Sequence, residues 1–208
     1  MVVAKSLQEN IIEQLKTNEL VSIPASEEDY LSIATALPFK VEYHANEIIT
    51  MGLASYLHEK LVITLGSILY NLLFEKDNFD ILGSNSGVSI PKFEGGFYMP
   101  DVMVVKGEPI FKENSKAIIT NPYIIVEVLS PATSTFDVEY KLPEYKHLES
   151  LQQIMYVSPR KVFVSTYVRS ENPNVWLNQD FHNLDDAIVV EGASVSLSDI
   201  YKKIKFEK

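Results

Sequence analysis

The sequence contains no cysteine, no long hydrophobic run and comparatively few basic residues. Without cysteine the chain has no disulfide, no thiolate nucleophile and no cysteine-ligated zinc or iron–sulfur centre. No run approaches the roughly 18 to 20 apolar residues that cross a bilayer, and the polar N-terminal segment does not resemble a signal peptide. We therefore expect a cytoplasmic protein without a membrane partner.

Basic residues are in deficit, because 18 Lys and Arg stand against 28 Asp and Glu, a formal net charge of −10. A field of this sign repels polyanions, so a nucleic-acid partner would have to be held by a local basic patch or through bound cations. Carboxylates that await a divalent metal also contribute negative charge. The composition therefore weighs against nucleic-acid binding without excluding it.

Length and composition are those of a globular chain. The 208 residues are 46% hydrophobic and 22% charged, and they contain no internal repeat or Gly/Ser linker. A chain of this size can bury one sizeable core. We expect a peripheral N-terminal segment over residues 1–24 and one domain over residues 25–208.

Hydrophobic periodicity predicts helices and strands in alternation. The predicted elements are helices over 6–20 and from 26, a hairpin over 40–51 with its turn at Ala45 and Asn46, a long helix over 56–74, strands near 79–82, 87–90, 102–105 and 123–129, a helix around 141–149, strands within 161–169, 174–181 and 187–190, and a closing helix over 196–204. This order predicts a mixed α/β sheet.

Two acids stand where aliphatic strand residues are expected. Asp101 opens the run in PDVMVV, and Glu127 stands inside the run in YIIVEVLS. An ionised carboxylate is costly in a buried strand unless it is paired or holds a metal. The two acids are 26 positions apart (127 − 101), a separation that lets adjacent strands bring both to one place. With the carbonyl of Val128 they would offer three oxygen ligands to a hard cation such as Mg²⁺.

A lysine follows on the next predicted helix. Asp137, Lys141 and Tyr145 recur at the four-residue spacing of one helix face. An ammonium group beside a metal site would orient a water molecule or stabilise charge in the transition state. Pro143 requires that the helix either begins near Leu142, with the proline in its first turn, or bends there.

Each of these residues also has a purely structural explanation. Pro-Asp is a common turn dipeptide, and Asp137 with Lys141 forms an ordinary i,i+4 pair. Glu47 would simply face solvent on its hairpin, and Glu127 would lie at the wet end of an edge strand. His58 fits a boundary position of the long helix, since no second histidine stands at zinc-ligand spacing.

The order of the motifs resembles a known family. MPDVMVV, NPYIIVEVLSPAT, DVEYKLPEY and SLQQIMYVSP follow one another, and Glu47 stands four residues before Met51, which stands seven before His58. Together they resemble a restriction-endonuclease family, formerly a domain of unknown function, of the PD-(D/E)xK nuclease superfamily. In that family the lysine has moved to the following helix, in the pattern D-x-x-x-K-x-x-x-Y. The resemblance covers roughly residues 25–200.

The resemblance implies an α/β fold with a restriction-endonuclease-like mixed sheet flanked by helices, plus an N-terminal helix and hairpin. It implies an endonuclease that hydrolyses DNA with Mg²⁺, or Mn²⁺ as a substitute, through a metal-activated water. By analogy it also implies a homodimer. The implied residues are Asp101, Glu127, Lys141 and Glu47 for catalysis, Asp101 and Glu127 beside Val128 for the metal, and Gln152, His58 and Tyr145 for the lining of the site.

Three departures from the family pattern leave an alternative open. Gln153 and Ile154 replace a frequent Glu-Tyr pair, Glu139 and Tyr140 replace small residues, and Pro143 follows the lysine closely. A displaced amine would weaken a geometry-sensitive site. Pro143 and the net charge of −10 motivate the alternative, a weak or inactive nuclease-fold protein that serves as a binding or assembly module. A glycosidase with a carboxylate pair is a third and less supported hypothesis.

Overall fold

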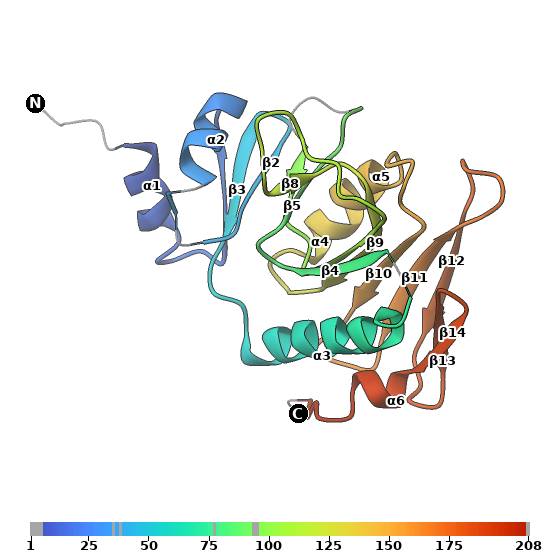
Figure 1. Ribbon diagram of the computed structural model, residues 1–208. Helices are drawn as coiled ribbons and strands as arrows, with labels where there is room; N and C mark the ends of the chain where they lie inside the picture. Colours follow the sequence, from blue (N-terminus) through green and yellow to red (C-terminus); the bar gives the residue numbers. More distant parts are fainter. Residues whose placement is uncertain (1–5, 35, 38, 77, 93–95, 207–208) are drawn as a thin grey trace, which may run out of the picture.

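The computed structural model describes residues 6–34, 36–37, 39–76, 78–92 and 96–206, and it confirms a mixed α/β fold (Figure 1). The elements are α1 (Leu7–Gln14), β1 (Leu20–Pro24), α2 (Glu27–Ala34), β2 (Val41–His44), β3 (Glu47–Met51), α3 (Tyr56–Leu73), β4 (Phe79–Gly83), β5 (Gly87–Ser89), β6 (Phe97–Tyr98), β7 (Val102–Lys106), β8 (Ile118–Ile119), β9 (Pro122–Val128), α4 (Ser134–Phe136), the π-helical turn η1 (Asp137–Lys141), α5 (Leu142–Tyr145), β10 (Gln153–Val157), β11 (Val164–Arg169), β12 (Trp176–Phe181), β13 (Ala187–Val190), β14 (Ala193–Ser196) and α6 (Leu197–Ile200).

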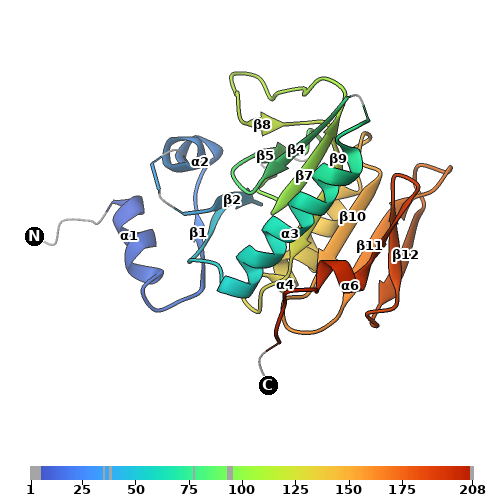
Figure 2. The same ribbon diagram turned by 60° about the horizontal axis from the view of Figure 1, so that its bottom comes forward.

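The main core is built on a six-stranded sheet in the order β12-β11-β10-β9-β7-β4, which we call the central sheet. Strands β9 and β10 are parallel and are joined through α4, η1 and α5, whereas the other neighbours are antiparallel. Helix α3 packs along one face (Figure 2). The α4–α5 segment and part of the second sheet pack on the other. Burial on both faces explains why β7 and β9 read as continuous apolar runs.

The second sheet has the order β1-β3-β2-β6-β5-β8 and carries α1 and α2 on its own small core. Strand β1 lies within the predicted peripheral segment and pairs antiparallel with β3. The predicted helix over 6–20 is too long, because α1 ends at Gln14. The Asn18 side chain donates to the Gln14 carbonyl at 2.9 Å. Such local side-chain bonds favour a turn over a continued helix.

The predicted hairpin and long helix are confirmed. Ala45 and Asn46 both have positive φ, 49° and 64°, as a two-residue hairpin turn of the primed type requires. Ser55 begins α3 by accepting a hydrogen bond from the backbone N–H of His58 at 3.2 Å. The hairpin and the start of α3 therefore follow from local sequence. No helix of the described residues is long and apolar enough to cross a membrane.

The crossover segment shows where Pro143 fits. It stands in the first turn of α5, but the helical segment does not begin there, because α4, η1 and α5 follow one another without a break and Lys141 and Leu142 both have αR backbone angles. The segment therefore corresponds to the second of the two arrangements, a longer helix that is irregular next to the proline. Because proline has no N–H, it cannot continue the regular ladder of the preceding turn. That turn is π-helical over Asp137–Lys141, a form that is frequent at functional sites. Both Asp137 and Lys141 are buried.

Candidate active site

Asp101 and Glu127 lie opposite each other at one end of the central sheet. Val102 pairs with Val126 in the antiparallel ladder of β7 and β9, so the next position outward sets Asp101 against Glu127. Residues directly opposite in such a ladder project to the same face, with Cβ atoms about 4.5–5.5 Å apart. Both side chains are buried. The strand register therefore brings the two acids together.

Glu127 uses one carboxylate oxygen for its contacts. Its Oε1 lies 3.3 Å from Lys141 Nζ and accepts a hydrogen bond from the Tyr145 hydroxyl at 2.8 Å. Its Oε2 accepts no hydrogen bond from the described residues. Burial raises the pKa of the Glu127 carboxyl to about 7, although Lys141 opposes the shift. Near neutral pH this carboxyl therefore exists in both protonation states.

Lys141 is surrounded by acids. Its Nζ lies 2.9 Å from Glu42 Oε1 and 2.9 Å from Asp137 Oδ1, in addition to Glu127. Burial would lower the pKa of the Lys141 ammonium, but Asp137, Glu127 and Glu42 raise it well above its ordinary value. The lysine is therefore charged, and three carboxylates share its single positive charge.

Asp101 has cationic partners of its own. Its Oδ1 lies 2.9 Å from Lys40 Nζ and 3.4 Å from His58 Nε2, while Oδ2 accepts the Val128 backbone N–H at 2.8 Å. Burial would raise the pKa of Asp101, but Lys40 and His58 bring it well below its ordinary value. The His58 Nδ1 is buried and has no hydrogen-bond partner among the described residues. Asp101 is therefore a stable carboxylate at neutral pH.

Two residues predicted from the sequence lie outside this cluster. Glu47 stands directly after the hairpin turn, and its carboxylate accepts a hydrogen bond from the Ser22 hydroxyl at 2.5 Å. Gln152 precedes β10, and its N–H donates to the Tyr123 carbonyl at the opposite end of β9 from Glu127. The hairpin turn and the parallel direction of β10 therefore carry these two side chains away from the cluster.

Glu42 is the hairpin acid that lies beside Lys141, where Glu47 was expected, and it is not among the residues predicted from the sequence. It is fully buried on β2, where Oε1 accepts the Met99 N–H at 2.8 Å and contacts Lys141. Its Oε2 is buried and has no hydrogen-bond partner among the described residues. A usable signal was present, because Glu42 stands between Val41 and Tyr43, an apolar setting like that of Glu127. Lys40 carried no comparable signal.

The cluster lies at the floor of a cleft of about 1520 Å³. Asp101, Glu127, Val128 and Lys141 line the floor, and His58 lies on the wall formed by the start of α3. Further walls come from the segment between α1 and β1, the loop after β9 and the segment after α6. Tyr145 lies behind the floor, where its hydroxyl holds Glu127. The buried acids are thus reached from a space large enough for a substrate segment.

Comparison with known proteins identifies the family. A family described as "Putative restriction endonuclease" matches residues 27–198, and the chain belongs to this family. This confirms the resemblance found in the sequence.

Two curated relatives come from Synechocystis. "Uncharacterized protein slr1290" is 30% identical over 183 residues, which cover 87% of this chain and 93% of the relative. "Uncharacterized protein sll1609" is 33% identical over 129 residues, 62% of this chain and 72% of the relative. The similarity to slr1290 thus extends over nearly the full length of both chains.

A solved structure supports the fold. The crystal structure of a "putative nuclease belonging to DUF820" from Anabaena variabilis superimposes with a TM-score of 0.64 at 19% sequence identity. The match covers 83% of this chain and 97% of that one. At this identity the likeness establishes the shared architecture.

Proposed function

We propose that the protein is a Mg²⁺-dependent endonuclease that hydrolyses phosphodiester bonds in DNA, with water as the nucleophile. The observation that carries the proposal is the convergence of Asp101, Glu127 and Lys141 at the floor of one cleft, although they are far apart in the sequence. The restriction-endonuclease description of the family, together with the likeness to the Anabaena nuclease, supports this class of activity.

The donor set fits a divalent cation. Glu127 Oε2 is without a hydrogen bond from the described residues, and Asp101 Oδ2 accepts only one, from the Val128 N–H. Hard cations prefer such carboxylate oxygens, and Mg²⁺ keeps several water ligands in proteins. Within the described ranges, no group of three or more acidic or histidine side chains is placed so that it could hold a metal ion. Two carboxylates, a carbonyl and water are therefore the set to test.

Asp101, Glu127 and the carbonyl of Val128 would hold the cation, which lowers the pKa of a bound water and neutralises charge on a phosphoryl oxygen. Lys141 would place its ammonium beside the reacting phosphate and stabilise the charge that develops there. Glu42 and Asp137 keep that ammonium charged and in position.

The cleft residues that touch Asp101 would have a supporting role. Lys40 and His58 orient the Asp101 carboxylate and keep it ionised, which a metal ligand requires. Tyr145 would fix the direction of the Glu127 carboxylate, because its hydroxyl donates to Oε1 and leaves Oε2 available to a ligand. A two-fold dimer, proposed by analogy alone, would present two such clefts to the two strands of DNA.

The alternative is a binding module without catalysis, and one observation favours it. Asp101, Glu127, Glu42 and Asp137 each contact a lysine in this structure, so the cluster has positive partners without a metal. A buried ion-pair network of this kind can serve structure alone. Calorimetric titration with millimolar Mg²⁺ distinguishes the two functions. A metal-dependent nuclease must bind Mg²⁺ and lose this binding in Glu127→Ala, whereas a binding module need not bind Mg²⁺ at all.

Cleavage of supercoiled plasmid DNA in the presence of Mg²⁺ or Mn²⁺ tests the proposal. Glu127→Ala should lower the cleavage rate by about 100-fold or more, because it removes a ligand from the reacting centre. Glu42→Gln and Glu47→Gln form a matched pair from one hairpin. The former should lose activity, since Glu42 holds Lys141, and the latter should keep it. Undiminished cleavage by Glu127→Ala would refute the assignment.

A further inference from the structure

The charge of the cleft lining is opposite to that of the whole chain. Seven of the 18 Lys and Arg residues line the cleft, but only five of the 28 Asp and Glu residues do so. The basic residues of the lining are Lys16, Lys40, Lys60, Lys141, Arg160, Lys203 and Lys205. A protein with a net charge of −10 has thus concentrated its positive charge around one opening.

Apart from Lys16, which follows α1, three of these basic residues have no side-chain partner among the described residues. Lys40 and Lys141 are paired at the floor, and Lys60 donates to the Lys203 carbonyl. Arg160, Lys203 and Lys205 are exposed, and none of them forms an ion pair with a described residue. We call these three residues the basic rim. Among the described residues, no acid neutralises their charged ends, which can therefore meet an external anion.

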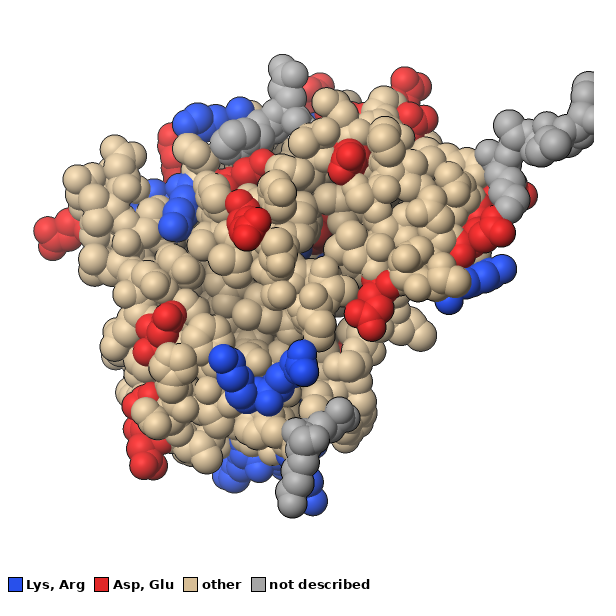
Figure 3. Space-filling model, turned by 180° about the vertical axis from the view of Figure 1, so that it is seen from behind, with Lys and Arg blue, Asp and Glu red and all other residues tan. Residues whose placement is uncertain are grey.

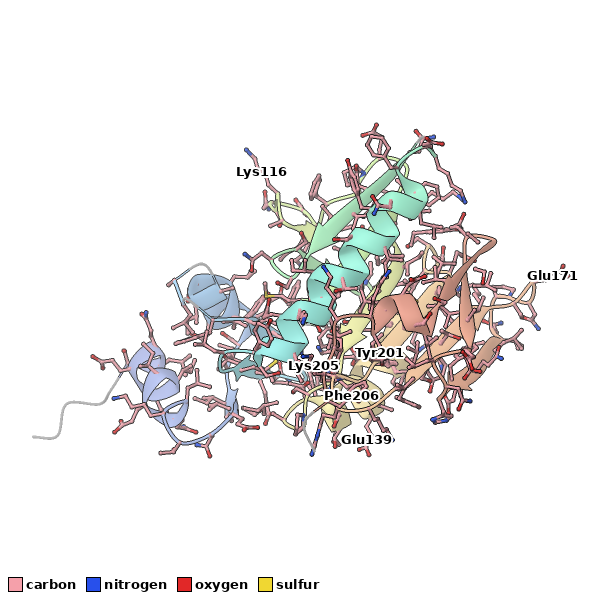
Figure 4. The ribbon with its side chains drawn as sticks, turned by 90° about the horizontal axis from the view of Figure 1, so that it is seen from below. Lys116, Glu139, Glu171, Tyr201, Lys205 and Phe206 are labelled. Carbon is pink, nitrogen blue, oxygen red and sulfur yellow. The ribbon has the colours of Figure 1, made fainter. Side chains whose placement is uncertain are left out.

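Arg160 of the basic rim lies at the same end of the central sheet as the two acids. Val157, the last residue of β10, pairs with Val128 beside Glu127, and Arg160 follows three residues later. Lys203 and Lys205 come from the segment after α6. Figure 4 shows Lys205 beside the N-terminal end of α3, whereas Lys116 lies far from it. Figure 3 shows Lys and Arg side chains gathered on the lower part of one face.

The two segments that carry the basic rim are fixed to each other. The Tyr201 hydroxyl contacts the carbonyls of Ser158 at 3.1 Å and Phe163 at 2.7 Å, which bracket the loop of Arg160. On the other side, the Phe206 ring lies 5.6 Å from the Tyr201 ring. Lys60 anchors the backbone between them through the Lys203 carbonyl. The backbone that carries the three charges is therefore preformed, and binding has to order only their side chains.

We propose that the basic rim binds the sugar–phosphate backbone of a nucleic-acid strand and seats it over Asp101 and Glu127. This inference rests on the proposed function, because it assigns substrate contacts to the same cleft. Screening limits distant charges to about 8 Å at physiological salt, so the local rim outweighs the negative remainder of the surface. The rim holds charged side chains that suit phosphates, so binding is independent of sequence.

The test measures binding in a variant that does not cleave. Fluorescence anisotropy with a labelled DNA duplex is followed between about 50 and 200 mM salt in the Glu127→Ala background, with Mg²⁺ present. Each lost phosphate contact reduces the salt dependence by about 0.9 logarithmic units per decade, or about 3.5-fold over this fourfold range. The triple variant Arg160→Ala, Lys203→Ala, Lys205→Ala should therefore show about 40-fold less salt sensitivity.

A matched triple variant controls for net charge. Lys76→Ala, Lys116→Ala and Lys146→Ala remove the same charge from residues outside the cleft lining, and the salt dependence should stay within twofold of the parent. Equal effects of the two triples, an unchanged slope for the rim triple, or no DNA binding by the parent would each overturn the inference. If wild-type protein cleaves DNA but the salt dependence of the rim triple variant is unchanged, the role of the basic rim is rejected and the nuclease function stands. Rim-dependent binding without wild-type cleavage rejects the nuclease alone.

Discussion

The two sides of the acidic cluster hold similar groups in opposite ways. Asp101 contacts Lys40 and also His58, whose pKa it raises, and the pKa of Asp101 itself lies well below the ordinary value. Glu127 shares Lys141 with two other acids, and burial raises its pKa to about 7. Burial alone therefore does not decide the protonation of a carboxyl. The protonation state also depends on how many positive groups each carboxylate contacts. Lys141 is shared by Glu127, Glu42 and Asp137, whereas Lys40 contacts Asp101.

The largest effect expected from this difference is the loss of Lys141. Lys141→Met leaves three buried carboxylates without their shared cation, and we expect a loss of about 3–5 kcal/mol in the free energy of unfolding. Lys40→Met is the comparison on the other side. Its loss should be clearly smaller, because Asp101 keeps His58 and the Val128 N–H. Urea unfolding at pH 7 measures both, and equal losses would contradict the described asymmetry.

The second effect is a pH dependence of stability. The folded-state pKa of Glu127 is about 7 and its ordinary value is 4.5, so the folded state binds more protons between these values. Wild-type protein should lose stability as the pH rises through this window. Glu127→Gln removes that cost, and we expect a gain of about 3 kcal/mol at pH 8 and little change below pH 4.5. Thermal unfolding without divalent metal, at pH 4 and pH 8, checks it.

Asp101→Asn should change the stability at pH 8 in the opposite direction in the same experiment. The folded-state pKa of Asp101 is lowered, so its contribution to stability is present above its ordinary pKa and is lost as the pH falls below it. This variant should therefore be less stable than wild type at pH 8 and approach it in strong acid. If both variants changed stability in the same direction at pH 8, the contrast between the two sides would be wrong.

The sequence predicted this end of the central sheet well, for a physical reason. Two apolar runs that each contain one acid define β7 and β9, and an antiparallel pair with Val102 opposite Val126 necessarily sets Asp101 against Glu127. The position of the start of β10 relative to Glu127 could also be predicted from the sequence. A crossover helix implies parallel strands, so Gln152, directly before β10, belongs at the end of the sheet away from Glu127.

Other features depended on tertiary packing. Glu42 and Glu47 both stand on the hairpin, and only the position of the second sheet against the central sheet decides which acid meets Lys141. Strands β6 and β8 have two residues each, which is too short for any periodicity to predict. Lys40 pairs with an acid 61 positions away, and no local pattern specifies such a distance.

The smallest effect sharpens the comparison at a single hydrogen bond. Tyr145→Phe removes the hydroxyl that donates to Glu127 Oε1, and its cost should be about 1 kcal/mol. Because this bond favours the ionised carboxylate, its loss should raise the pKa of Glu127 further. Tyr98→Phe is the matched control, since that hydroxyl donates to Glu144 at 2.5 Å and not to Glu127. The pKa of Glu127, measured by carbon-13 NMR titration of its carboxyl carbon, should rise in Tyr145→Phe and stay unchanged in Tyr98→Phe. A shift common to both would mean that packing of the rings, rather than the hydroxyl, controls this side of the cluster.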